Sequence, residues 1–202
     1  MNFQYPIFLD LAGKKCLVVG DHPEIPFKIQ GLLAAGARVE HQPACDPADL
    51  ADRFLVIAAL PDNSEIFRLC EERNILCNSI DDPNNCRFAF GAVCRQRDLT
   101  IAISTNGAAP ALAARLRQKL ERQIGPEHGE FLALLKELRP EIAARVPDFA
   151  ARRDLWYRIV DSDALDLLRK GDAVAAHASI RALIDRASST SRSDTSARDA
   201  DR

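Results

Sequence analysis

KCLVVG, residues 15–20, is a short apolar run that ends in glycine, and it predicts a buried strand. A helix is expected next, because four apolar residues follow at helical spacing and Gly36 is typical of a helix end. The four are Ile25, Ile29, Leu32 and Leu33. A second strand is expected over residues 37–40. A strand, a helix and a strand in this order form a right-handed crossover, so the sequence predicts a parallel sheet.

The following segment predicts two more strands on either side of one helix. Residues 54–59 are the most apolar strand candidate in the chain, and residues 75–78 are a further one. The helix between them is expected to open with a capping box from Asp62 to Glu65. Only 14 residues separate Val39 from the strand at 54–59, so a third strand-helix unit has been shortened here.

The second half of the chain changes character. Residues 88–94 and 99–104 are apolar runs separated by four polar residues, which predicts a β-hairpin or adjacent antiparallel strands. Helices are expected from Pro110 onward, because leucines recur there at every fourth residue. Residues 188–202 contain almost nothing to bury and predict a disordered tail. The fold class is therefore α/β, with a hairpin region and a helical C-terminal half.

Composition excludes several classes of protein. The 202 residues are 47% apolar and 28% charged, which are globular values. A net charge of −2 argues against a protein that chiefly binds nucleic acid. The chain has no apolar run near the ~20 residues that cross a bilayer and no signal peptide, so a soluble cytoplasmic protein is expected. Six scattered cysteines without a CxxC pair predict small buried thiols and no metal site.

The loop after the first strand is a candidate nucleotide site. In such sites glycines let the backbone approach a pyrophosphate that lies on a helix N-terminus. Here the loop over residues 20–26 reads GDHPEIP, and only its first residue is glycine. Asp21 and Glu24 place negative charge where phosphate oxygens would lie, and His22 adds a bulky ring. Taken alone, the loop favours a strand-helix turn without a cofactor.

Two polar segments are candidate binding sites for a small molecule. Asp81 and Asp82 follow a predicted parallel strand, at the edge where open α/β sheets bind ligands, although either could simply start the turn at Pro83. The turn over residues 104–107 leads into a helix that carries four basic side chains. Such a helix start can receive carboxylates, although a solvated basic face explains the same pattern. The basic residues are Arg115, Arg117, Lys119 and Arg122.

Four stretches together make the chain resemble the siroheme synthase family. They are YPIFLDL at 5–11, CNSIDDPNNCRF at 77–88, IAISTNGAAPALAARLRQKLE at 101–121 and GPEHGEF at 125–131. The resemblance implies a Rossmann-like domain over residues 1–87, a dimerisation region with swapped strands over 88–125 and a helical domain over 126–187. It also implies a homodimer.

The resemblance implies an activity and a set of site residues. Family members oxidise precorrin-2 to sirohydrochlorin with NAD, and many then insert ferrous iron as the substrate of a chelatase step. Asp81 matches the aspartate that serves both steps as proton acceptor. The cofactor-binding positions are Gly20, Asp21, His22 and Lys28. The positions expected to bind the tetrapyrrole are Asn78, Ser104, Thr105, Asn106, Gly107 and Arg115.

The departures from the family pattern fall on the nucleotide side. The family loop reads roughly GGGxVAxRK, and this chain keeps only Gly20 and Lys28 of its glycines and basic residues. The stretch after Val39 is short, and the polar turn after the third strand has become LPDN at 60–63. The hypothesis is that NAD affinity is weakened or lost while tetrapyrrole binding persists. An NAD-independent chelatase and a non-catalytic tetrapyrrole-binding protein are therefore alternatives to the dehydrogenase.

Overall fold

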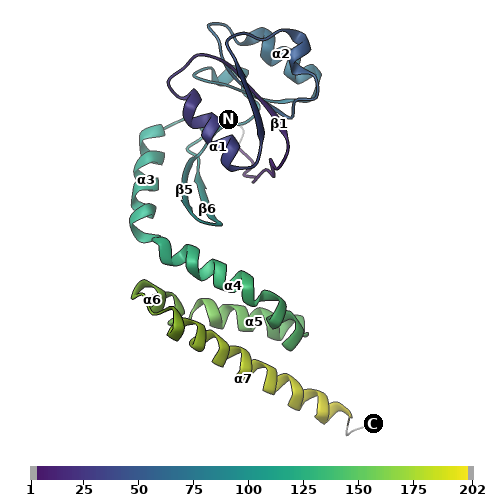
Figure 1. The fold of residues 1–202 in the computed structure, drawn as a ribbon, viewed down its shortest axis with the longest axis vertical. Helices are drawn as coiled ribbons and strands as arrows, with labels where there is room; N and C mark the ends of the chain where they lie inside the picture. The colour runs from purple at the N-terminus through teal and green to yellow at the C-terminus, as the bar shows by residue number, and fades with distance from the viewer. Residues whose placement is uncertain (1–3, 200–202) are drawn as a thin grey trace. The chain divides into compact units, whose positions relative to one another are not determined.

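A computed structural model describes residues 4–199, with side chains up to residue 189 (Figure 1). The chain divides into two compact units, Met1–Phe90 and Gly91–Arg202. The boundary lies three residues beyond the predicted end of the first domain at residue 87. The segments predicted as a dimerisation region and a helical domain fall together in the second unit.

The first unit contains a four-stranded parallel sheet with the strand order β2-β1-β3-β4. The predicted strand-helix-strand crossover at its start is confirmed (Figure 1). The elements of this unit are β1 Lys15–Gly20, α1 Ile25–Ala34, β2 Arg38–Gln42, η1 Pro47–Leu50, β3 Leu55–Ala59, α2 Ser64–Glu72, β4 Leu76–Ser79 and η2 Pro83–Asn85.

Helices cover both faces of this sheet. Val18 and Ile57 face α1, whereas Val19 and Ala58 face α2, and all four side chains are fully buried. Strands that are buried on both faces read as continuous apolar runs rather than alternating ones, which is why β1 and β3 were visible in the sequence. The shortened connection forms only the 3-10 helix η1, so β2 remains an edge strand.

The start of α2 differs from the prediction. No capping box joins Asp62 to Glu65, because the Asp62 carboxylate accepts a hydrogen bond from the Ser64 amide at 2.9 Å and Glu65 pairs with Arg68. The N-cap is Asn63, whose side-chain oxygen accepts from the Leu60 amide at 2.9 Å. Short polar side chains at such turns form hydrogen bonds with nearby backbone groups. The bond between Asp62 and the Ser64 amide therefore takes the place of the predicted capping box.

The second unit begins with an antiparallel hairpin and continues as helices. The predicted hairpin is confirmed as β5 Ala92–Gln96 and β6 Leu99–Ile103. Buried side chains of α4 to α7, such as Ile142, Ile159 and Ile180, form one apolar core. The helices are α3 Pro110–Gln123, α4 Pro126–Arg145, α5 Phe149–Val160, α6 Ala164–Arg169 and α7 Ala173–Asp199.

The expected disordered tail begins inside a helix. Residues 188–199 continue α7, and residues 200–202 lie outside the described part of the chain. Ser188 is buried, and its hydroxyl accepts a hydrogen bond from Arg145 of α4 and donates to the carbonyl of Ile184. A helix that is already formed and packed extends at little cost in free energy. The contact between Ser188 and Arg145 could not be predicted from the polar composition of residues 188–202.

An ion pair between the hairpin turn and α4 gives a testable pH dependence. The Lys136 ammonium donates to the Asp98 carboxylate at 2.9 Å and lowers the pKa of that carboxyl below its usual value of 3.8. Because the folded-state pKa is lowered, the pair stabilises the fold above pH 3.8, and this contribution is lost as the pH falls through the folded pKa. NMR titration should show that Lys136→Gln raises the pKa of Asp98. An unchanged Asp98 titration in the variant would contradict this.

No helix within residues 4–199 has the length and apolar character needed to cross a membrane.

Candidate functional site

Four of the predicted site residues of the first unit gather at the carboxyl edge of its sheet. Gly20 is the last residue of β1 and is followed by Asp21 and His22, and Asp81 lies two residues after β4. In a parallel sheet these loops leave the same edge. The His22 Nε2 atom lies 3.4 Å from the Asp81 Oδ2 atom, so the first and fourth strands contribute to one cluster.

Gly20 has a conformation that only glycine adopts without strain. Its φ is +94°, and a Cβ atom built on it would lie 2.3 Å from the Ala59 carbonyl oxygen. The Gly20 carbonyl oxygen itself is 2.9 Å from the His41 Nε2 atom. The close approach of β1 to the end of β3 therefore explains this glycine, with or without a nucleotide.

The N-terminus of α1 does not fit a pyrophosphate. The amides of Glu24 and Ile25 already donate to the Nδ1 atom and the carbonyl oxygen of His22, at 3.2 and 3.0 Å. Pro26 has no amide hydrogen. The Lys28 ammonium lies 3.0 Å from the Glu24 carboxylate and 4.2 Å from the centre of the Phe90 ring. The donors of a phosphate site are thus engaged within the chain, and Asp21 and Glu24 would repel the anion.

The sequence analysis did not predict one hydrogen-bond donor at the carboxyl edge of the sheet. Gln42 is the last residue of β2, and its Nε2 atom is buried with no hydrogen-bond partner among the described residues. A buried amide without a partner is costly. A polar residue at the final position of a strand was the available signal.

A tight loop presents Asp81 to solvent. Asp81 has a φ of +57°, a region that aspartate tolerates better than most residues, and its side chain is 86% exposed. The Asn78 amide donates to the Phe88 carbonyl at 2.8 Å and is 8% exposed. The Cys86 thiol donates to the Ser79 carbonyl at 3.2 Å and closes the loop. Asn78 and Cys86 therefore hold the loop that carries Asp81, and sequence reasoning missed Cys86.

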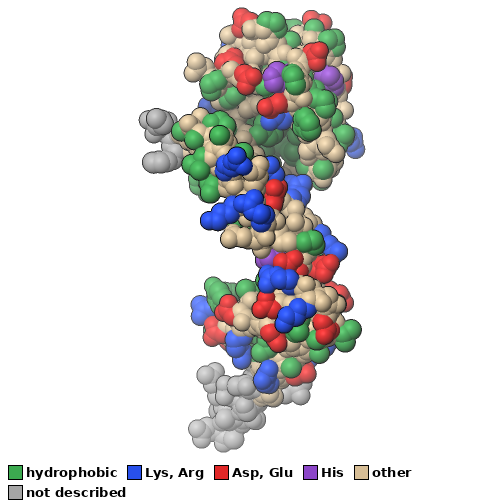
Figure 2. Space-filling model, turned by 90° about the vertical axis from the view of Figure 1, so that its left-hand side faces the viewer, with side chains coloured by type: hydrophobic (Ala, Val, Ile, Leu, Met, Phe, Trp, Pro, Cys, Tyr) green, Lys and Arg blue, Asp and Glu red, His purple; other side chains and the backbone are tan. Residues whose placement is uncertain are grey.

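The remaining predicted residues form a turn in the second unit. The Ser104 hydroxyl accepts from the Asn106 amide at 3.1 Å, and the Thr105 hydroxyl accepts from the Ala109 amide at 3.3 Å. Asn106 and Gly107 both have a positive φ. Arg115 on α3 is exposed and donates to Gln118. Figure 2 shows Lys and Arg side chains gathered over this part of the second unit.

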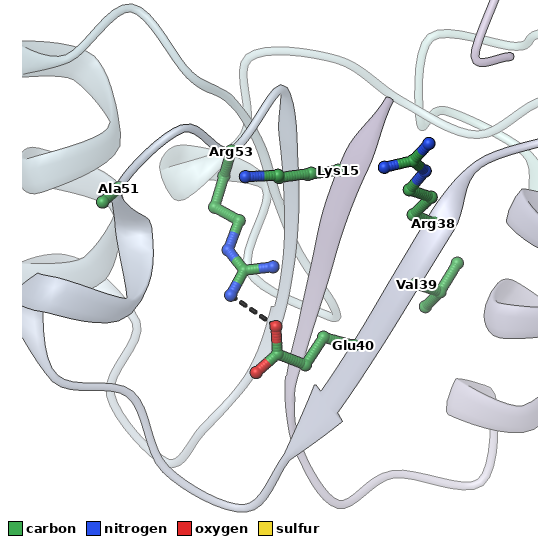
Figure 3. Close-up of a pocket in the computed structure, with 6 residues that line it drawn as sticks. All are labelled: Lys15, Arg38, Val39, Glu40, Ala51 and Arg53. Carbon is green, nitrogen blue, oxygen red and sulfur yellow. Dashed lines mark hydrogen bonds and ion pairs between the residues drawn. The ribbon is translucent and has the colours of Figure 1, made fainter. Parts of the chain in front are cut away.

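An open pocket of about 410 Å³ lies at the opposite, amino end of the same strands (Figure 3). Its charges are largely neutralised in pairs, because Arg53 bonds to Glu40 at 2.5 Å and Lys15 lies 3.8 Å from Asp52. Open α/β sheets bind ligands at the carboxyl edge, so this pocket is not part of the candidate site. Its lining residues are Lys15, Arg38, Val39, Glu40, Ala51 and Arg53.

The cysteines and histidines form no metal centre in the described part of the chain. All six thiols are free, and Cys16, Cys70, Cys77 and Cys94 are buried, as small core side chains would be. Burial and two acidic neighbours raise the pKa of the half-buried Cys45 thiol to about 11.

Comparison with known proteins identifies three family models along the chain. Residues 39–92 match the model described as "Putative NAD(P)-binding", which begins after the loop at residues 20–28. Residues 96–123 match the central region of sirohaem biosynthesis proteins, and residues 127–184 match the sirohaem synthase dimerisation region. The label of dimerisation region thus falls on the helices α4 to α7, and the segment expected to dimerise, 88–125, largely matches the central model instead.

Curated relatives match most of this chain. The siroheme synthase of Thioalkalivibrio sulfidiphilus is 34% identical over 200 residues, which cover 87% of this chain and 41% of the relative. The siroheme synthase of Methylococcus capsulatus is 32% identical over an alignment of 213 positions, which covers 94% of this chain and 44% of the relative. The chain thus spans about two fifths of the length of the curated relatives it matches.

A solved structure shares the fold. It is "SirC, precorrin-2 dehydrogenase", with a TM-score of 0.68, 20% identity, and coverage of 91% of this chain and 98% of that one. The three family models occur in order from the parallel sheet to the last helix, and the curated relatives match across both units. On this combined match, the chain belongs to the siroheme synthase family.

Proposed function

We propose that this chain oxidises precorrin-2 to sirohydrochlorin with NAD(P), as a step of siroheme biosynthesis. The observation that carries the proposal is Asp81, presented at the carboxyl edge of a parallel sheet in a chain of this family. Relatives named siroheme synthase and a fold shared with a precorrin-2 dehydrogenase support it.

Asp81 is suited to the proton-transfer part of this reaction. Oxidation of the macrocycle removes two hydrogens: NAD(P), when bound, would take one as a hydride, and a carboxylate can accept the other as a proton. The Asp81 side chain is exposed and lies on a loop held by Asn78 and Cys86, so its carboxylate can reach a large flat substrate. The residues of α1 that would hold a pyrophosphate are engaged elsewhere, so the nucleotide is expected to bind weakly.

The polar turn of the second unit is suited to the substrate's carboxylates. Precorrin-2 carries several carboxylate groups, and guanidinium groups and helix starts bind such groups well. Arg115 on α3 is exposed, and the turn over residues 104–107 lies just before that helix. We therefore assign residues 104–107 and Arg115 to the binding of the substrate's carboxylates.

We also propose that the chain works as a cytoplasmic homodimer. The match of residues 127–184 to a dimerisation region supports this assignment. Helix α5, within that region, exposes three large apolar side chains that a partner could cover. They are Phe149, Tyr157 and Val160, which are 72%, 64% and 52% exposed.

A second candidate follows from the loop after β1. If the engaged amides of Glu24 and Ile25 exclude the nucleotide, Asp81 could still accept pyrrole N–H protons while ferrous iron, as a substrate, enters sirohydrochlorin. A tetrapyrrole-binding protein without turnover is the remaining alternative.

An anaerobic absorbance assay of precorrin-2, with and without NAD, tests the first proposal. Appearance of sirohydrochlorin that depends on NAD supports the dehydrogenase. Bound but unchanged precorrin-2 would overturn it, and iron insertion into sirohydrochlorin in the same preparation would then favour the chelatase.

Nucleotide affinity should increase when the loop glycines are restored. The double variant Asp21→Gly/His22→Gly removes one carboxylate and frees the Glu24 amide, so we expect NAD to bind about tenfold more tightly, a gain of ~1.4 kcal/mol. Isothermal titration calorimetry measures this affinity. Asp52→Gly is the control that should leave it unchanged, because Asp52 precedes β3 at the opposite end of the strands and has a positive φ of 58° that glycine tolerates. Micromolar NAD binding by the unaltered chain would contradict the loop argument.

A further inference from the structure

His22 occupies a position where the family loop has glycine, and its ring contacts another residue of the candidate site. Its Nε2 atom lies 3.4 Å from the Asp81 carboxylate, and its side chain is 30% exposed, against 86% for Asp81. The two residues come from loops after β1 and β4, with β3 lying between those strands in the sheet. The His22 ring is therefore the more restricted side chain of the pair, and the exposed Asp81 carboxylate has the greater freedom to move.

The hydrogen bond on the other ring nitrogen decides where the imidazole proton lies. The Glu24 amide donates to His22 Nδ1 at 3.2 Å, so Nδ1 acts as an acceptor. In the neutral ring the hydrogen must then be on Nε2, the atom that faces Asp81. The backbone of α1 thus fixes the ring as a donor toward the carboxylate.

We propose that His22 is a positioning residue that orients the Asp81 carboxylate for proton transfer, in place of the phosphate contact that this loop has lost. The proposal rests on the proposed function, in which Asp81 is the proton acceptor. With Nε2 facing Oδ2 at 3.4 Å, Oδ1 remains available to the substrate proton. The same loop residue therefore explains both the poor fit to a pyrophosphate and the placement of the acceptor.

A double-mutant cycle separates this role from a merely structural one. We expect His22→Ala to lower kcat about fivefold with KM unchanged, since an exposed pair contributes modestly. His22→Gln, which keeps an N–H donor, should restore most of kcat. In an Asp81→Asn background, measured in single turnovers, His22→Ala should add no further loss, because its effect acts through Asp81.

The cycle has a matched control and an outcome that overturns the proposal. His177→Gln changes a histidine of α7 in the second unit and should leave kcat unaltered. Losses from His22→Ala and Asp81→Asn that multiply would show that His22 acts independently of Asp81, and the proposal would fall.

A second measurement does not depend on turnover. The imidazole ¹⁵N and ¹H resonances of His22 should show an unprotonated Nδ1 and should shift in Asp81→Asn, but not in Asp82→Asn. Resonances that ignore Asp81→Asn would overturn the pairing itself. An inactive wild-type protein whose His22 resonances respond to Asp81 would instead reject the proposed reaction while supporting the contact.

Discussion

Replacing Asp81 with asparagine should reduce turnover of precorrin-2 by about 10²- to 10⁴-fold, the contribution typical of a positioned general base. Asparagine has the same shape but cannot accept the proton. It also tolerates the positive φ of 57° at this position, so the loop keeps its course. Initial rates of sirohydrochlorin formation measure kcat, and absorbance titration measures binding of the tetrapyrrole, which should remain.

The neighbouring aspartate provides the control for this experiment. Asp82 accepts a hydrogen bond from Asn85 at 2.6 Å within the same loop, and Asp82→Asn keeps an acceptor there. We expect its kcat to stay close to that of the wild-type protein. If Asp81→Asn retained wild-type kcat, the assignment of Asp81 as proton acceptor would be wrong.

Replacing Gly20 with alanine should lower the free energy of unfolding by about 2–5 kcal/mol, from left-handed strain and overpacking together. The φ of +94° disfavours any Cβ atom, and that atom would meet the Ala59 carbonyl oxygen at 2.3 Å. The Ala59 oxygen is a backbone atom, and the position of a Cβ atom is fixed by the backbone of residue 20, so the clash cannot be relieved by a side-chain rotation. Urea unfolding followed by circular dichroism measures the change.

Gly31→Ala is the matched control for Gly20→Ala. Gly31 lies within α1, and a Cβ atom on it would meet nothing within 4 Å. Alanine is the better helix former, so this variant should gain about 0.5–1 kcal/mol. If both variants unfolded at the same urea concentration as the wild-type protein, the packing of β1 against β3 described above would be wrong.

The fold followed from local patterns in the sequence. β1 and β3 are apolar on both faces, and α1 between β1 and β2 has helical spacing, so the parallel crossover was predictable. The hairpin over β5 and β6 was predictable because four polar residues leave no room for a helix. The capping box at α2 was predicted wrongly, because several short polar side chains compete there for the same amides.

Some residues of the candidate site could likewise be predicted from the sequence, and others could not. Asp81 could be selected from the sequence because it matches the aspartate of the siroheme synthase family, whereas its place after a parallel strand alone left a turn-forming role open. The roles of Gln42 and Cys86 could not, since a buried amide and a loop-closing thiol are defined by what surrounds them. Residues 188–199 were missed for a related reason, because Ser188 is held by Arg145 from a distant helix.

The sequence by itself determined that this chain has a parallel sheet followed by a hairpin and helices, and that its nucleotide loop is altered. Periodicity and glycine placement act over a few residues, and such information is fully present in the order of the amino acids. Only the tertiary structure showed that His22 faces Asp81 and that its other nitrogen is fixed by the Glu24 amide. That contact joins residues almost sixty positions apart, and it exists because parallel strands end at one edge.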